Sequence, residues 1–459
     1  MSLSRKRKIG FGLTNIGSLM APQAVGMYLM YFYINSTVLG ESDLGILLVG
    51  VAWTIFAIWD AVNDPFIGQW SDKTRSRWGR RKPFIIFGLP FLLVFYYFLW
   101  NPIMFSEVIP MFIVLVVLLC LYDTFLTMST LWYAMFPEIS TRMNDRLEIS
   151  TYLQIAGIFG LMFAFVVPSL LQDLGFGWNI IALILCVVIF ISFLMPVISV
   201  KEKREFSLDK PLSLWKALTT SLKNKSFLTY LGTQLTLQLS YSIAVATIPF
   251  FVNDVLNGNL TVLLLIMFLT IIPSLFVWVW FSSRSGPKKA LSASMVILMI
   301  AFIITLFVTE SNKSIIVVVL ILAGIGLAGP MLLPTIMIAD VCDEDETKTC
   351  VRREGIYTGI SGFIVKLSTS ISGIIVTGIL AFTGYIAATE IEPHPIQPAS
   401  AIQGIHILMG LITIIPIIIG LLILYKYPLV GATLAKLKKD VEDLHEEKAR
   451  KLLEQKDNV

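Results

Sequence analysis

The sequence predicts an all-α integral membrane protein whose twelve transmembrane helices form two six-helix bundles. Composition supports this prediction, because 56% of the 459 residues are hydrophobic and only 14% are charged. The mean hydropathy is +0.80, whereas soluble domains usually contain about 25% charged residues. These values exclude an ordinary soluble enzyme and a disordered chain, and they predict the lipid bilayer rather than nucleic acid as a partner.

Twelve apolar stretches are long enough for helices that cross a bilayer, and polar breaks separate them. Lys and Arg collect on the cytoplasmic side of membrane proteins. Of the 35 basic residues, all but Lys313 and Lys366 lie at the N-terminus, at the even-numbered connections or in the tail. We therefore expect a plasma-membrane protein with both termini in the cytoplasm, and we call the opposite side the predicted outer end. The spans are 10–38, 43–69, 83–104, 109–137, 148–172, 177–199, 227–256, 259–281, 289–309, 314–339, 355–387 and 403–425.

The longest internal polar segment, residues 200–226, divides the spans into six and six. We expect an N-terminal bundle in residues 1–199, a cytoplasmic linker in 200–226 that could lie on the membrane surface, and a C-terminal bundle in 227–427. Residues 428–459 are charged and carry apolar residues at helical spacing, which predicts an amphipathic helix. The basic connections after spans 2 and 8 resemble each other, as in transporters built from internal repeats.

Ionisable side chains inside the membrane cost about 2.5–3.5 kcal/mol each on insertion scales and mark functional sites. In span 2, Asp60, Asn63 and Asp64 are spaced by three and four residues and therefore share one helical face. Two carboxylates this close repel each other unless a cation lies between them. With Asp123 of span 4, they predict a site for a hard cation. The alternative for Asp64 is a helix-ending role before the next proline.

Lys366 lies near the middle of span 11, in the other half of the chain. An amine at this depth needs a carboxylate or water, so we predict that it faces Asp60 or Asp123 and couples cation binding to helix packing. The alternative is that its ammonium extends to the membrane surface.

The basic connection after span 2 contains one acid, Asp72, among several arginines. One interpretation is a topology signal alone. The other is a gating role, in which Asp72 forms a salt-bridge latch between the half-bundles at the inner side. Further gating residues are expected at the inner ends of spans 10 and 11, so that the predicted gating set is Asp72, Arg77, Arg80, Arg81, Asp340, Arg352 and Glu354.

Several motifs resemble those of the glycoside-pentoside-hexuronide:cation symporters, a family of the major facilitator superfamily that includes the melibiose permease. The most specific is WDAVNDPFIGQWSDKTRSRWGRRKP, which begins at Trp59. Supporting matches are YDTF in span 4, IMIADVCD at the end of span 10, and VRREG and IVK around span 11. The resemblance implies two six-helix bundles around a central cavity. It also implies solute uptake coupled to sodium, lithium or protons, without an organic cofactor or a required protein partner.

The resemblance assigns the cation site to Asp60, Asn63 and Asp64, gives Asp123 a part in both the cation and sugar sites, and puts Lys366 beside them. Galactoside carriers of the family have a Lys-Asp pair in span 1, where this chain has Ser18 and Leu19. The cation site is thus largely kept, with Cys120 in place of a hydroxyl ligand, while the galactoside site is not. Aromatic and amide side chains suit sugar rings or else simply pack, and the predicted solute-binding set is Asp123, Tyr122, Thr127, Gln154, Tyr152, Gln234, Gln238 and Tyr28.

The leading hypothesis is a cation-coupled symporter of a sugar, glycoside or related small polar solute that works by alternating access. A carrier of lysolipids or other amphiphiles is the alternative within the same superfamily, because the sugar-binding acid of span 1 is missing. A sensor that binds without transporting is a weaker alternative. An enzyme is not expected, because the three histidines are scattered and the sequence has no phosphate-binding GxxxxGKS loop.

Overall fold

A computed structural model of the chain describes residues 4–76, 78–136, 143–200, 223–349, 354–388 and 395–457. Side chains are described for the same residues except 143–144, 146–147, 354–356 and 445–457. All regular elements in these ranges are helices, as predicted. The predicted linker lies largely outside the described residues, as do Arg77 and Arg352.

Eleven of the described helices are long and apolar enough to cross a membrane, and they correspond to predicted spans 2–12. The first predicted span is also helical from Arg5 to Ser36, with a π-helical turn in the middle. The spans consist of α1 Arg5–Ala24, η1 Val25–Leu29 and α2 Met30–Ser36; α3 Asp43–Lys73; α4 Lys82–Trp100; α5 Val108–Thr130 with η3 Leu131–Met135; α7 Met143–Asp173; α8 Trp178–Ser199; α10 Lys225–Phe250 with η5 Phe251–Val255; α11 Leu260–Ser285; α12 Pro287–Thr305; α13 Ile315–Thr349; α14 Glu354–Phe382; and α15 Ala399–Ile407, η7 Leu408–Ile412 and α16 Thr413–Tyr425.

Short 3-10 turns form two of the outer connections, η2 Val38–Glu41 and η6 Glu310–Asn312.

The tail contains the expected helix, α17, which runs from Gly431 to Asp457. Its apolar residues Leu437 and Val441 are buried, in agreement with the amphipathic pattern.

Packing groups the residues into two compact units that do not follow the predicted boundary at 200–226. Unit 1 contains Met1–Lys210, Ser242–Leu265 and Thr369–Met409, and unit 2 contains the remaining segments. Unit 1 therefore combines the first six spans with the predicted outer parts of α10, α11 and α14 and with α15. The division into two six-helix bundles stays a prediction.

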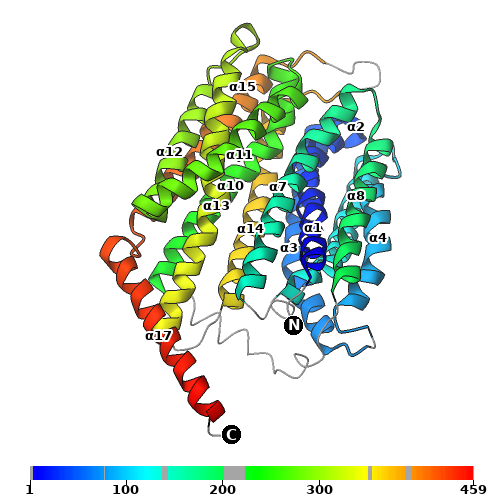
Figure 1. The fold of residues 1–459 in the computed structure, drawn as a ribbon. Coiled ribbons are helices and arrows are strands. Elements are labelled where there is room, and N and C mark those ends of the chain that lie inside the picture. The colour runs from blue at the N-terminus through cyan, green and yellow to red at the C-terminus, as the bar shows by residue number, and fades with distance from the viewer. Residues whose placement is uncertain are drawn as a thin grey trace. The chain divides into compact units, whose positions relative to one another are not determined.

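Within unit 1, α1 packs against both α7 and α8 (Figure 1). The α5 helix packs against both α3 and α4. Aromatic rings fill the space near the predicted outer end, where the Trp100 and Trp178 rings stack 4.6 Å apart and Phe32 meets both. This aromatic packing joins α2, α4 and α8, whereas Ile67 of α3 and Met128 of α5 meet in a separate buried apolar cluster with Phe84 of α4.

Within unit 2, α13 packs against α12, and α12 also contacts α16. The tail helix α17 lies along α13 (Figure 1).

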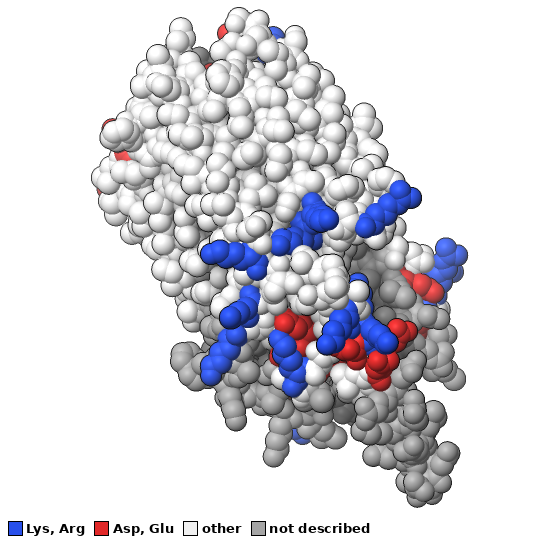
Figure 2. Space-filling view, turned by 90° about the vertical axis from the view of Figure 1, so that its left-hand side faces the viewer, with Lys and Arg blue, Asp and Glu red and all other residues white. Residues whose placement is uncertain are grey.

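Figure 2 shows a face with a broad area free of charged side chains, whereas Lys and Arg gather toward one end with Asp and Glu near them. A wide uncharged area with charges at its edge suits a surface in contact with lipid.

Candidate functional site

The predicted cation site lies where α3 and α5 pack against each other. Asp60 and Asn63 of α3 are buried, and Asp123 and Thr127 of α5 are buried opposite them. Asp64 is half-buried. The three-and-four spacing on α3 is matched by a four-residue spacing on α5, so each helix presents its polar residues on one face.

Hydrogen bonds join four of these residues into one polar cluster. Asn63 Nδ2 donates to Asp123 Oδ2 at 3.1 Å and to Thr127 Oγ1 at 3.2 Å. Thr127 Oγ1 in turn donates to Asp64 Oδ1 at 2.7 Å. The structure thus brings Asn63, Asp64 and Asp123 together through the hydroxyl of Thr127. We call Asp60, Asn63, Asp64, Asp123 and Thr127 the polar cluster.

Counting hydrogens fixes the orientation of the Asn63 amide. The single hydroxyl hydrogen of Thr127 goes to Asp64, so Thr127 accepts from Asn63, and the amide nitrogen faces the two acceptors. Both amide hydrogens are then used, and the Asn63 carbonyl oxygen makes no hydrogen bond within the described part of the chain. This oxygen and the nearby carboxylates are the kind of ligands that hard cations prefer.

The polar cluster is a mixed set of carboxylate, amide and hydroxyl groups. No group of three or more His, Cys, Asp or Glu side chains in the described ranges is arranged to hold a metal ion.

Asp60 lies one helical turn before Asp64 and is 8% exposed. The neighbouring Tyr122 is 1% exposed, and its hydroxyl has no hydrogen-bond partner among the described residues. Trp59, on the same segment of α3, donates from Nε1 to Thr124 Oγ1 at 3.0 Å. The α3 and α5 helices are therefore linked by polar contacts at Trp59 as well as at Asn63 and Asp64.

Neutral residues occupy the part of α1 where galactoside carriers have their charged pair. Trp132 Nε1 donates to Ser18 Oγ at 2.9 Å. Asn15 Nδ2 donates to the carbonyl oxygen of Leu153 at 2.8 Å, and the Tyr133 hydroxyl donates to Asn15 Oδ1 at 2.6 Å. These polar groups are thus used to hold α1 against η3 and α7.

The other predicted solute-binding residues have varied surroundings. Tyr28 is buried and donates to the carbonyl oxygen of Phe165. Tyr152 is half-buried and accepts from Arg5 Nε at 3.4 Å, while Gln154 is exposed. The described hydrogen bonds of Tyr28 and Tyr152 do not join them to the polar cluster, and their solute-binding role stays a prediction.

Gln234, Gln238 and Lys366 lie in unit 2, on the inner halves of α10 and α14. All three side chains are half-buried. Ser368 donates to the carbonyl oxygen of Leu235 at 3.1 Å and links these two helix halves. The predicted approach of Lys366 to Asp60 or Asp123 joins different units and stays a prediction.

The predicted latch residues pair within the connection after α3. Asp72 Oδ1 lies 3.7 Å from both Arg80 Nη1 and Arg81 Nη2. Arg81 also donates to the carbonyl oxygen of Ala134 in η3. Lys82 donates to the carbonyl oxygen of Val197 at 2.7 Å. These contacts tie the connection to α8 and η3, and a latch between half-bundles stays a prediction.

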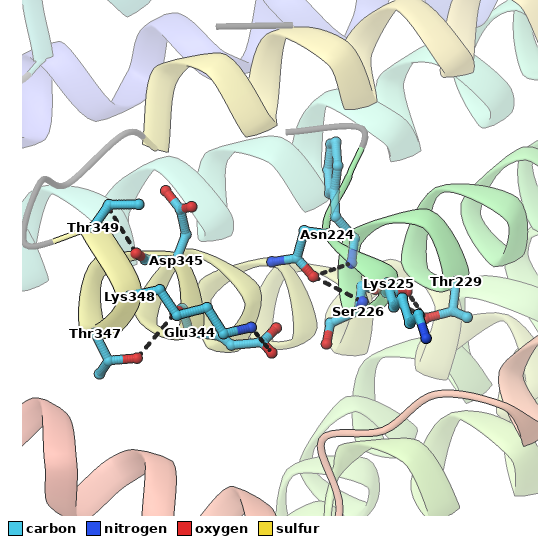
Figure 3. A network of polar contacts seen from close by, with 10 residues as sticks. Asn224, Lys225, Ser226, Thr229, Glu344, Asp345, Thr347, Lys348 and Thr349 are labelled. Atoms are coloured by element: carbon cyan, nitrogen blue, oxygen red, sulfur yellow. Dashed lines mark hydrogen bonds and ion pairs between the residues drawn. The ribbon is translucent and has the colours of Figure 1, made fainter. Parts of the chain in front are cut away.

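The inner end of α13 contains more charge than its predicted span, because the helix continues from 339 to Thr349. Asp340 is buried, and its Oδ1 lies 3.8 Å from Lys438 Nζ of the tail helix. One turn later, Lys348 pairs with Glu344 at 2.6 Å, as Figure 3 shows. The figure also shows Asn224, whose side chain accepts from the Ser226 backbone N–H at 2.8 Å and caps α10. Glu354 begins α14, but its side chain lies outside the described ones.

An ion-pair group that was not expected from the sequence joins the starts of α1 and α7. Lys8 Nζ lies 2.6 Å from Asp145 Oδ1 and 2.9 Å from Glu148 Oε2. The Lys8 and Asp145 side chains are 7% and 9% exposed. The hydrogen bond with Asp145, followed by that with Glu148, raises the pKa of the Lys8 ammonium. The three-residue spacing of Asp145 and Glu148 was the available signal, but nothing in it identifies Lys8 as the partner.

Comparison with known families assigns most of the chain. Residues 10–431 match the family described as MFS/sugar transport protein. This match includes all twelve predicted spans in full.

Two relatives differ in the solutes that their names state. The chain is 24% identical to the sodium-dependent lysophosphatidylcholine symporter 1 of Xenopus tropicalis, over 93% of this chain and 88% of that protein. It is 25% identical to the glucuronide carrier protein homolog of Escherichia coli strain K12, over 93% of both chains.

A solved structure shows the fold. The crystal structure of a D-xylose-proton symporter superposes with a TM-score of 0.65 at 13% sequence identity, over 94% of this chain and 99% of that one. The predicted major facilitator fold is therefore confirmed, and the chain has the architecture of a multi-pass membrane transporter rather than an enzyme.

Proposed function

Because the chain belongs to the MFS/sugar transport protein family, we propose that it is a cation-coupled symporter of a sugar, glycoside or related small polar solute. It works by alternating access, in which the site opens to one side of the membrane at a time. Sodium, lithium or a proton is the coupling cation. The symporters among its relatives support coupling to a cation, and one of them is named as sodium-dependent.

The polar cluster between α3 and α5 carries this proposal. Buried carboxylates inside a membrane are costly, at about 2.5–3.5 kcal/mol each on insertion scales. A cation bound among Asp60, Asp64 and Asp123 offsets this cost, and the unbonded Asn63 carbonyl supplies a neutral ligand. The chain of hydrogen bonds through Thr127 means that a cation at one carboxylate affects the others.

Coupling follows from this shared network. Cation binding orders the residues of α3 and α5 that also border the solute, including Asp123, and thereby raises solute affinity. By thermodynamic linkage, the solute raises cation affinity by the same factor. Lys366 acts from α14 as a positive charge whose interaction with the acids depends on whether a cation is present.

A carrier of lysolipids or similar amphiphiles is a second candidate function. It is favoured by the neutral surroundings of Ser18, where the polar groups of α1 are occupied by Trp132, Tyr133 and Leu153. The lysophosphatidylcholine symporter relative supports the same candidate. A sensor that binds solute without moving it is the remaining alternative. In either transport case we place the protein in the plasma membrane with cytoplasmic termini, as the basic residues favour.

Purified protein in liposomes tests these alternatives together. A panel of labelled sugars, glycosides and lysophosphatidylcholine is offered under imposed sodium, lithium or proton gradients. Accumulation of a sugar or glycoside that depends on one cation gradient supports the proposal. Accumulation of lysophosphatidylcholine alone supports the second candidate, and binding without accumulation under every gradient contradicts transport.

A further inference from the structure

A second group of polar residues, separate from the polar cluster, lies at the predicted outer end. It combines Asn35 at the end of α2, Asp254 in η5, and Tyr385 just after α14, all within unit 1. The Tyr385 hydroxyl lies 3.1 Å from Asn35 Oδ1 and 3.0 Å from Asp254 Oδ2. These contacts connect a helix of the first six spans with two segments of the second six.

The hydrogens in this group can be counted. Asn35 Nδ2 donates to the carbonyl oxygen of Tyr31 at 3.1 Å, and Asn35 Oδ1 accepts from the Ala388 backbone N–H at 3.0 Å. The amide orientation is therefore fixed, and Oδ1 faces Tyr385 as an acceptor. The ordinary pKa of a tyrosine hydroxyl is about 10, so the Tyr385 hydroxyl keeps its hydrogen over the pH range of interest.

One hydroxyl hydrogen thus faces two acceptors, Asn35 Oδ1 and Asp254 Oδ2. If it points to Asn35, a lone pair of the Tyr385 oxygen faces Asp254 at hydrogen-bond distance. That contact is favourable only when the carboxyl of Asp254 is protonated and donates to Tyr385. In this protonated form each of the two oxygen–oxygen contacts of Tyr385 contains a hydrogen, whereas the ionised form leaves one of them without.

Among the described residues near Asp254, His406 is the group that can gain a positive charge. The titratable groups near Asp254 are Tyr385, Tyr31 on α2, and His406 on α15, whose ring lies 5.5 Å from that of Phe251 in η5. No Lys or Arg side chain forms an ion pair with Asp254 in the part of the chain that the structure describes. A carboxylate with few neutralising neighbours favours the protonated form.

Other contacts at the same end also join a helix of the first six spans to a segment of the second six within unit 1. Thr261 donates to Ser169 Oγ at 2.8 Å, and Asn259 Nδ2 donates to Asp173 Oδ2 at 2.9 Å. Both pairs join α7 to α11 or the turn before it. Opening toward the outside requires these contacts and the Asn35–Tyr385–Asp254 contacts to separate.

We propose that Asp254 is a proton-binding site of an outer gate, protonated when the gate is closed and ionised when it opens to water. Protons and gate closing are therefore linked, so acid outside favours the closed gate and alkali favours the open one. One linked proton changes the ratio of closed to open gates by at most a factor of about 10 per pH unit. The proposal concerns the gate alone and holds for any solute or coupling cation.

The gate can be followed by the distance between two spin labels. Ser36 at the end of α2 and Ser400 in the first turn of α15 are exposed and lie in unit 1. Both are replaced by cysteine after the four native cysteines have been replaced by serine, and the labelled protein in lipid nanodiscs is measured by electron–electron double resonance from pH 5 to 8.5. No solute is needed, so the result is independent of the symport proposal.

We expect a population of longer distances to grow as pH rises in the otherwise unchanged protein. Asp254→Asn, which retains a donor toward Tyr385, should remain closed at every pH. Tyr385→Phe should be more open at acidic pH and lose most of the pH response. Asp43→Asn, which removes an exposed carboxylate at the same end, should respond as the unsubstituted protein does.

Two outcomes overturn the proposal. One is a distance distribution that does not change between pH 5 and 8.5. The other is a full pH response in Asp254→Asn, which would mean that a group other than Asp254 binds the linked proton. Monodisperse size-exclusion profiles verify folding. If Asp254→Asn does not fold, the pH response of Tyr385→Phe tests the proposal instead.

Discussion

Replacing Gly50 with alanine should force α3 away from α14 near the predicted outer end. A Cβ atom at Gly50 would lie 2.0 Å from Thr377 Oγ1 and 3.1 Å from the carbonyl oxygen of Gly373. Ordinary van der Waals contact begins at 3.4 Å. Thr377 cannot turn away freely, because it is β-branched and its hydroxyl donates to the Gly373 carbonyl at 2.9 Å.

The size of the effect follows from the cost of overpacking, which is about 1–3 kcal/mol for an added methyl group in a tight contact. The clash exists only while α3 and α14 are close, so this cost falls on the closed gate. At 1.4 kcal/mol per factor of ten, the ratio of closed to open gates should fall about 5- to 150-fold. Such a change is easily visible in a distance distribution.

The spin-label pair at Ser36 and Ser400 measures this ratio at acidic pH, where the gate is expected to be closed. Thr377→Ala removes the oxygen that the new methyl group meets, so the double variant of Gly50→Ala and Thr377→Ala should close again. Thr377→Ala alone should resemble the unsubstituted protein. A closed gate in Gly50→Ala, or a double variant as open as the single one, would refute the reasoning.

Three further predictions concern the other contacts. Thr127→Val removes the bridging hydroxyl and should weaken cation affinity about 10- to 150-fold, since hydrogen bonds to charged groups contribute about 1.5–3 kcal/mol; isothermal titration checks this, with Thr130→Val as the control. Lys8→Met should lower the melting temperature more than Lys6→Met, whose side chain is exposed. The raised pKa of Lys8 means that its stabilisation is fully present below the ordinary lysine pKa and is lost as pH rises through the raised value, so melting temperatures of the two variants should converge at strongly alkaline pH. Lys438→Met should reduce hydrogen-exchange protection of α17 by no more than about fivefold, because a pair with one exposed partner contributes about 0–1 kcal/mol; unchanged protection would mean that the buried apolar residues alone hold the tail helix.

Hydropathy and basic residues predicted the fold well, because a bilayer forces apolar helices of a narrow length range. Helix ends were less predictable where the helix continues beyond the lipid. The α13 helix extends ten residues past its predicted span to Thr349. Ion pairs between residues four apart, such as Glu344 and Lys348, stabilise a helix that is exposed to water. Hydropathy therefore predicts the ends of the membrane-spanning segment but not the end of the helix.

The candidate site was predictable as far as its carboxylates, because charge inside a membrane is rare. Thr127 was expected only as a solute contact, and its hydrogen bonds to Asn63 and Asp64 depend on the register between α3 and α5. Asp254 was visible as an acid at the end of a span, but its neighbours Asn35 and Tyr385 are more than 100 residues away in either direction. Pairings of this kind depend on tertiary packing.

Direct cation binding to the purified protein tests the central claim that the polar cluster holds the coupling cation. Sodium and lithium are titrated into the solute-free protein, with choline as an inert control and pH varied to detect competition by protons. We predict saturable binding that Asp123→Asn abolishes and that Asp43→Asn leaves unchanged. Binding of the same affinity in Asp123→Asn and in the unsubstituted protein would contradict the account.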